Sequence, residues 1–184
     1  MDAPWAEQLA ERLLAEPLPD RWAHSRGVGL KARELRQLAG EHADTLEAAA
    51  FLHDIGYAPP LVDTGFHPLD GAHYLRDHTD APPLLCTLVA HHTCAIMEAE
   101  ARGLDDVLLA EFPLHDDLEH TLVAAITHCD LSVGPTGSPT DAQHRIAEIL
   151  ARYPRDNPVH QAIQRARPVL LRQDQMIRGR LPPR

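Results

Sequence analysis

His53 and Asp54 stand side by side in the apolar run of residues 50–56. An unpaired carboxylate buried in such surroundings costs several kcal/mol, so the chain must supply a cation for it. Imidazole and carboxylate groups are common ligands of divalent transition metals. Neighbouring side chains on a helix point about 100° apart, so both could reach one ion, or the carboxylate could bridge two. The pair therefore predicts a metal site.

Further candidate ligands occur before and after this pair. They are His24, His67, the adjacent His91 and His92, and Asp130. Asp130 lies in the otherwise apolar residues 126–131, where a carboxylate is not expected to remain unpaired. A second metal ion would need imidazoles of its own, and His67 and the His91-His92 pair are the candidates for it.

The composition predicts an all-α fold. The chain has 184 residues, of which 44% are hydrophobic and only 4% aromatic, so its core must come from Leu, Ala, Val and Ile. Such a core favours helices over sheets. The length suits a single domain spanning residues 1–184. Its core would cover about residues 20–133, with C-terminal helices at 138–180 packed on it.

Helical periodicity and capping signals place the elements that would position these residues. We expect helices at about 4–16, 20–39, 43–56, 67–78, 83–92 and 116–133, a short helix and loop at 98–112, and two final helices. Asp20 and His67 are the expected N-caps of the second and fourth helices. Ser138 and Asn157, each followed by Pro, are the expected caps of the last two. No segment alternates as a strand would.

Charge and cysteine content narrow the partners and the compartment. The net charge of −10 argues against non-specific binding to nucleic acid or to an anionic membrane. Three cysteines without a CxxC pair suggest reduced thiols in a cytoplasmic protein. No apolar run of about 18 residues and no signal-peptide pattern are present. We therefore expect a cytoplasmic protein that binds neither membranes nor nucleic acid; a homodimer is an option that the sequence leaves open.

In their order along the chain, these residues resemble the HD superfamily of metal-dependent phosphohydrolases. The string at residues 53–56 resembles the HDIG variant of the family motif. Residues 67–72 resemble the segment that supplies the second metal in dinuclear members, and residues 126–131 resemble the helix with the last aspartate ligand. The resemblance covers roughly residues 20–133 and implies an all-α HD-domain bundle.

The resemblance also implies roles for these residues. His24, His53, Asp54 and Asp130 would hold one metal ion. Asp54 would bridge to a second ion bound by His67 and His92, with His91 nearby or also a ligand. Hydroxide activated by the metals would attack phosphorus, which gives Asp54 and His53 catalytic roles. Asp20, one helical turn before His24, would be a further ligand in trinuclear relatives.

The implied cofactors are one or two divalent transition metals, Fe or Mn first, with Zn, Ni and Co as alternatives. The implied substrate is a nucleotide or a related small phosphorylated metabolite, and Arg21, Arg26, Tyr57 and Arg76 are candidates to contact it. Tyr57 stands where related cyclic-dinucleotide phosphodiesterases have Lys, and their Gly-Tyr-Pro motif is missing after His92. These departures argue against hydrolysis of cyclic di-GMP.

Two other functions use the same residues. The same ligands filled with two irons would support a mixed-valent diiron oxygenase, as some members of the superfamily do. A degenerate, non-catalytic HD module would instead only bind a nucleotide or a partner. The complete ligand set argues against the non-catalytic module.

Overall fold

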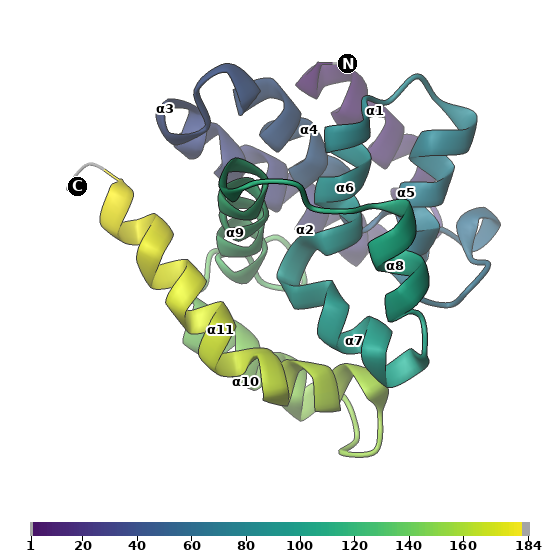
Figure 1. The fold of residues 1–184 in the computed structure, drawn as a ribbon, viewed down its shortest axis with the longest axis vertical. Coiled ribbons are helices and arrows are strands. Elements are labelled where there is room, and N and C mark those ends of the chain that lie inside the picture. Colours follow the sequence, from purple (N-terminus) through teal and green to yellow (C-terminus); the bar gives the residue numbers. More distant parts are fainter. Residues whose placement is uncertain (1, 182–184) are drawn as a thin grey trace.

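The computed structural model describes residues 2–181, which are almost entirely helical (Figure 1). The α-helices are α1 (Ala3–Leu14), α2 (Pro19–Ala32), α3 (Arg36–Ala39), α4 (Ala43–Leu52), α5 (His67–His78), α6 (Pro83–His91), α7 (Ala95–Arg102), α8 (Asp105–Glu111), α9 (Asp117–Leu131), α10 (Ala142–Arg152) and α11 (Pro158–Arg180). Short 3-10 turns join several of them: η1 (Arg33–Leu35), η2 (Gly40–His42), η3 (Ile55–Tyr57), η4 (Pro59–Leu61) and η5 (His92–Cys94). Within this range the only β-type pairing is an isolated bridge between Val133 and Pro139. The expected all-α fold is confirmed.

Helix α4 is the centre of the main core. It packs against α1, α2, α6 and α9, and its residues from Leu46 to Leu52 are all buried. Ala48, Ala49 and Ala50 have no exposed surface. Three consecutive small side chains leave room for neighbouring helices on every side. The fold therefore carries the end of α4, and with it the His53-Asp54 pair, into the interior.

The C-terminal helices cover one side of this core. Helix α11 runs along α7, α9 and α10 at the edge of the molecule (Figure 1). A second apolar cluster, which includes Leu131, Ile146, Ile149, Ile163 and Leu170, holds α9, α10 and α11 together. Helices α10 and α11 thus contact α9, while the expected division into a core at about 20–133 and C-terminal helices at 138–180 stays a prediction.

Several helices begin or end at residues other than those expected from the sequence. Asp20 is not the N-cap of α2, because the rigid Pro19 already occupies the first helical position and Leu18 precedes it as the cap. The same helix ends at Ala32 rather than running on to residue 39. His67 is likewise not a cap: Phe66 takes that place and His67 is the first residue of α5.

Two further boundaries matter for the site. Helix α4 ends at Leu52, so His53 is its C-cap and Asp54 lies between the helix and η3. Helix α10 is capped by Asp141, which accepts a hydrogen bond from the backbone N–H of His144, so the expectation of a cap at Ser138 is wrong. The expected cap at Asn157 is confirmed, because its side chain accepts from the N–H of Val159.

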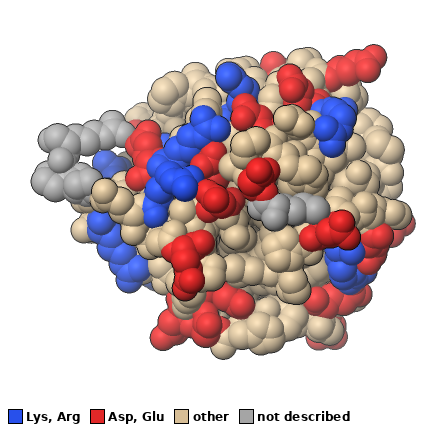
Figure 2. Space-filling view, turned by 90° about the horizontal axis from the view of Figure 1, so that it is seen from above, with Lys and Arg blue, Asp and Glu red and all other residues tan. Residues whose placement is uncertain are grey.

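The described surface carries mixed charges. The face in Figure 2 shows acidic and basic side chains interspersed rather than gathered into one broad basic patch. None of the described helices combines the length and the apolar character needed to cross a membrane.

Gly56 permits a close contact between η3 and α5 on which the site depends. A Cβ at Gly56 would lie 2.0 Å from the carbonyl oxygen of His67, which is backbone and cannot move aside. We predict that Gly56→Ala lowers the free energy of unfolding by about 3 kcal/mol, at the upper end of the range for overpacking. The measurement is urea denaturation followed by circular dichroism.

Gly179→Ala is the matched control. Nothing lies within 4 Å of a Cβ at Gly179 in α11, so this change should leave stability equal or slightly higher. Equal stability of the two variants would contradict the prediction.

Candidate metal centre

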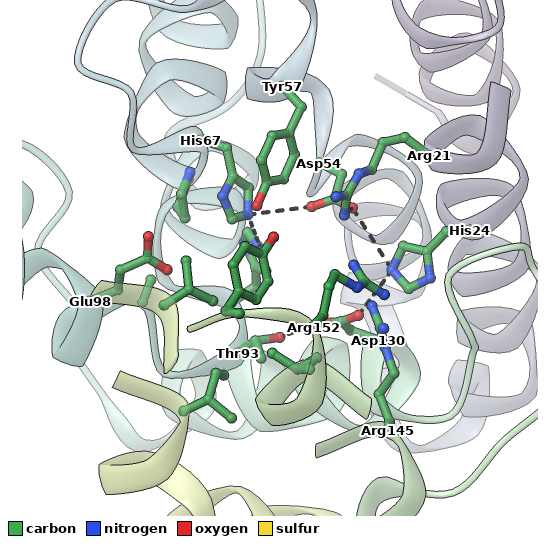
Figure 3. A pocket seen from close by; sticks show the side chains of 17 residues that line it. Arg21, His24, Asp54, Tyr57, His67, Thr93, Glu98, Asp130, Arg145 and Arg152 are labelled. Atoms are coloured by element: carbon green, nitrogen blue, oxygen red, sulfur yellow. Dashed lines mark hydrogen bonds and ion pairs between the residues drawn. The ribbon is translucent and has the colours of Figure 1, made fainter. Parts of the chain in front are cut away.

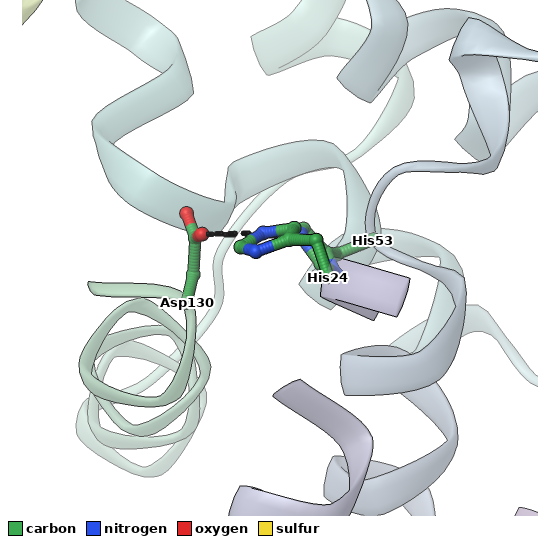
Figure 4. A group of neighbouring side chains, drawn as sticks. All are labelled: His24, His53 and Asp130. Atoms are coloured by element: carbon green, nitrogen blue, oxygen red, sulfur yellow. Dashed lines mark ion pairs between the residues drawn. The ribbon is translucent and has the colours of Figure 1, made fainter. Parts of the chain in front are cut away.

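Two groups of buried side chains could each hold a metal ion. The first consists of His24 from α2, His53 at the end of α4 and Asp130 from α9 (Figure 4). In it, His24 Nε2 lies 3.0 Å from Asp130 Oδ1, and His53 Nε2 lies 4.0 Å from the same oxygen. Three elements far apart in the sequence therefore bring their polar atoms to one point.

The second group consists of Asp54, His67 from α5 and His92 from η5. His67 Nε2 lies 3.3 Å from Asp54 Oδ1 and 3.1 Å from His92 Nε2. Two imidazole nitrogens and a carboxylate oxygen so close together form an arrangement suited to a divalent transition metal.

Asp54 connects the two groups. Its Oδ1 faces His67, whereas its Oδ2 lies 3.4 Å from His53 Nε2 and 3.8 Å from His24 Nε2 (Figure 3). One carboxylate thus presents one oxygen to each group. This is the geometry that a bridging ligand between two ions requires.

The backbone orients three of the imidazoles. The Nδ1 atoms of His24, His53 and His92 lie 2.7–3.0 Å from backbone carbonyl oxygens of Gly134, Ala50 and Val89. A carbonyl can only accept, so each Nδ1 donates its proton to the backbone and each Nε2 faces the site. Metal-bound histidines are commonly held in this way.

Two of these nitrogens show directly that the residues fit a metal. The Nε2 atoms of His24 and His53 are buried and make no hydrogen bond within the described part of the chain. Leaving a buried polar atom unsatisfied is costly, and a metal ion would remove that cost. The donor set, imidazole nitrogen and carboxylate oxygen, suits the same ions.

The electrostatic environment differs among the ligands. Burial by itself would lower the pKa of His53, but Asp54 and Asp130 raise it above its ordinary value. Burial lowers the pKa of His92 to about 4 and the pKa of His67 well below its ordinary value, so both are neutral at pH 7. Burial by itself would raise the pKa of Asp54, but Arg21 and His53 hold it well below the usual range. The pKa of Asp130 is also lowered, by His24 and His53, despite its burial. Both carboxylates are therefore charged.

Arg21 and Tyr57 lie against the second group. Arg21 Nη1 donates a hydrogen bond of 2.7 Å to Asp54 Oδ2, and its guanidinium lies 4.1 Å from the centre of the Tyr57 ring. That ring in turn stacks on the imidazole of His67 at 4.0 Å. Both residues line the cavity of about 70 Å³ over the two groups, and their contact with a substrate stays a prediction.

The structure places other candidates elsewhere. His91 Nε2 lies 2.6 Å from the carbonyl oxygen of Phe112, so His91 points away from both groups. Arg26 pairs with Glu7 at the surface, and Arg76 pairs with Asp77 and Glu111. Asp20 is exposed in the first turn of α2 and belongs to neither group.

Five further residues line the cavity, and the sequence analysis had not singled them out. Thr93, Glu98, Arg145, Arg152 and Tyr153 all line it (Figure 3). Thr93 Oγ1 donates to Asp130 Oδ2, and its backbone is left-handed at φ 51°, a strain that favours a functional role. For Arg145 and Arg152, the one signal in the sequence was their seven-residue spacing, which places both side chains on the same face of a helix.

The family comparison agrees with this geometry. The family model described as "HD domain" matches residues 21–150, which is most of the chain and includes every residue of both groups. Among solved structures, none matches the chain significantly. An all-helical fold, a buried His-Asp pair and two groups of metal-binding side chains come together in the matched region. The chain belongs to the HD domain family.

Proposed function

We propose that this protein is a metal-dependent phosphohydrolase that cleaves a phosphoester or phosphoanhydride of a nucleotide or a related small metabolite. The observation that carries the proposal is Asp54, whose two oxygens face two separate groups of metal-binding side chains. Hydrolases that act on phosphate use such paired sites to stabilise both the attacking and the leaving oxygen. Membership of the HD domain family supports a hydrolase of this kind.

One ion would be held by His24, His53, Asp54 and Asp130, and a second by Asp54, His67 and His92. Divalent ions held there, Fe or Mn in the first place and Zn, Ni or Co as alternatives, would supply Lewis acidity toward a phosphoryl group and lower the pKa of water. His53 and Asp54 have the catalytic role, since they are where the two groups meet.

Arg21, Tyr57 and two isoleucines of the cavity would bind and shield the cleaved phosphate group. Arg21 presents a permanent positive charge beside Asp54 and is positioned to contact a phosphate oxygen. The Tyr57 ring contacts both Arg21 and His67, which fixes the guanidinium and the imidazole before substrate arrives. Ile149 and Ile163 supply an apolar wall that reduces the water around the reacting groups.

Asp54→Asn removes the bridging charge while keeping the size of the side chain. We expect phosphate release by Mn²⁺- or Fe²⁺-loaded protein to fall at least about 100-fold. Replacing a residue that only hydrogen-bonds to a metal ligand already lowers metal affinity or activity about 10–100-fold, and Asp54 would itself be a ligand. The assay uses nucleoside monophosphates and dinucleoside polyphosphates, and circular dichroism verifies the helical content. Asp106→Asn, an exposed change in α8, is the control and should keep wild-type rates.

Full activity of Asp54→Asn would overturn the proposal. Oxygen uptake without phosphate release would support the diiron oxygenase instead. Metal binding with neither activity would support the non-catalytic module.

The adjacent histidines give a second test, because only His92 points into the second group. We expect His92→Ala to bind one metal ion fewer per chain than the wild type. His91→Ala should keep the full metal content, although it loses the contact with Phe112 and unfolds at a lower temperature. Elemental analysis after dialysis measures the ions. Loss of metal in His91→Ala but not in His92→Ala would contradict the assignment.

A further inference from the structure

Two arginines of α10 line the metal cavity without belonging to either metal group. Arg145 and Arg152 are seven residues apart on α10, and both side chains extend toward the side of the cavity where Asp130 and His24 lie (Figure 3). The helix that carries them is held in place by the apolar cluster of α9, α10 and α11. Their position is therefore set by the fold.

A single carboxylate pairs with both guanidinium groups. Arg145 Nη1 donates to Glu148 Oε2, and Arg152 Nε donates to Glu148 Oε1 at 2.8 Å. Arg152 Nη2 donates to the same Oε1. Glu148 thus brings two positive charges together but can neutralise only one of them.

Arg145 is the buried member of this pair. Its side chain is only 5% exposed, and its Nε is buried without a hydrogen-bond partner in the described part of the chain. Arg152 lines the same cavity but is 33% exposed, so it has access to solvent. A buried guanidinium with an unused donor is costly unless an acceptor reaches it.

Asp130 is a second carboxylate close enough for Arg145 to lower its pKa, but this carboxylate is already engaged. Asp130 accepts from Thr93 and faces His24, and it is one of the groups that would hold a metal ion. With ions bound, the carboxylates of Asp54 and Asp130 would face those cations. The positive charge of Arg145 and Arg152 would then be only half balanced, next to a positively charged centre.

We propose that Arg145 and Arg152 form a second anion subsite beside the metal centre, so that the substrate carries a phosphate or carboxylate in addition to the phosphate that is cleaved. This inference rests on the proposed function for the position of the cleaved phosphate. Guanidinium groups suit the role because their planar donors match the oxygens of carboxylate and phosphate. Tyr153 and Ile149 also line this cavity, and its small volume of about 70 Å³ favours a short spacing between the two anionic groups.

The test is calorimetric binding of three small probes to Mn²⁺-loaded protein. Ethyl phosphate has one anionic group, 2-phosphoglycolate replaces its methyl group with a carboxylate, and ethylene glycol bisphosphate replaces it with a phosphate-bearing arm. We expect the wild type to bind one or both of the doubly anionic probes at least tenfold more tightly than ethyl phosphate. The tighter of the two identifies the second group as carboxylate or phosphate.

Variants assign this preference to the two arginines. Arg145→Met and Arg152→Met keep the length of the chain and should bring the ratio of affinities close to one, with the affinity for ethyl phosphate changed by less than threefold. Arg167→Met, at an exposed position of α11, is the control and should keep the wild-type ratio. If Arg145→Met does not fold, Arg152→Met decides the matter, because its side chain is partly exposed.

The outcomes separate the subsite from the proposed function. Equal affinities of the wild type for all three probes, or a preference unchanged in the arginine variants, would overturn the subsite even if metal is bound. Absence of bound metal in the wild type, together with probe affinities unaffected by Asp54→Asn, would overturn the proposed function. A preference that still depends on the arginines would then uphold the subsite alone.

Discussion

The structure is organised around one buried charge, the carboxylate of Asp54. Its side chain is only 4% exposed, and such a group is stable in its charged form only if cations approach it. Arg21 provides one of them directly at 2.7 Å. The two groups of side chains on either side would provide the others by holding metal ions. Much of the local structure serves to present Asp54 to both groups at once.

The ends of helices, rather than their middles, create this arrangement. Asp54 lies where α4 has ended and η3 has not begun, so its side chain is not confined to one helix face. The absence of a side chain at Gly56 then lets the first turn of α5 come close enough for His67 to reach Asp54. Backbone carbonyls near the ends of α4, α6 and α9 orient three of the imidazoles. Precise placement of ligands therefore depends on backbone packing, which is rigid.

The sequence was a better guide to the fold class and the family than to the directions in which the histidine side chains point. An all-α fold followed from composition and periodicity, and the family from the ordered set of His24, His53-Asp54, His91-His92 and Asp130. The directions of His91 and His92 could not be predicted, because a kink with left-handed backbone at Thr93 and Cys94 follows them. No residue there is a glycine, so the sequence carries no signal of that conformation.

The helix starts were misjudged for a similar reason. A capping residue before a proline is a local signal, and it predicted Asn157 correctly but Ser138 wrongly. Near residue 138 the chain is held by a turn and by a long-range contact instead: Gly134 N donates to Ser138 O within the turn, and Gly137 lies against the backbone of Ala23. Arg145 and Arg152 were missed because nothing local shows that α10 faces the cavity.

The same loop explains why the C-terminal helices are part of the site. The carbonyl of Gly134 orients His24, and Gly137 adopts φ 82° where a Cβ would lie 2.6 Å from the carbonyl oxygen of Ala23. The segment that leads from α9 into α10 is thus fixed against α2, the helix that supplies His24. Any displacement of α10 would be transmitted to a candidate metal ligand as well as to the two arginines. The first metal group and the wall that faces it are therefore positioned by one continuous set of backbone contacts.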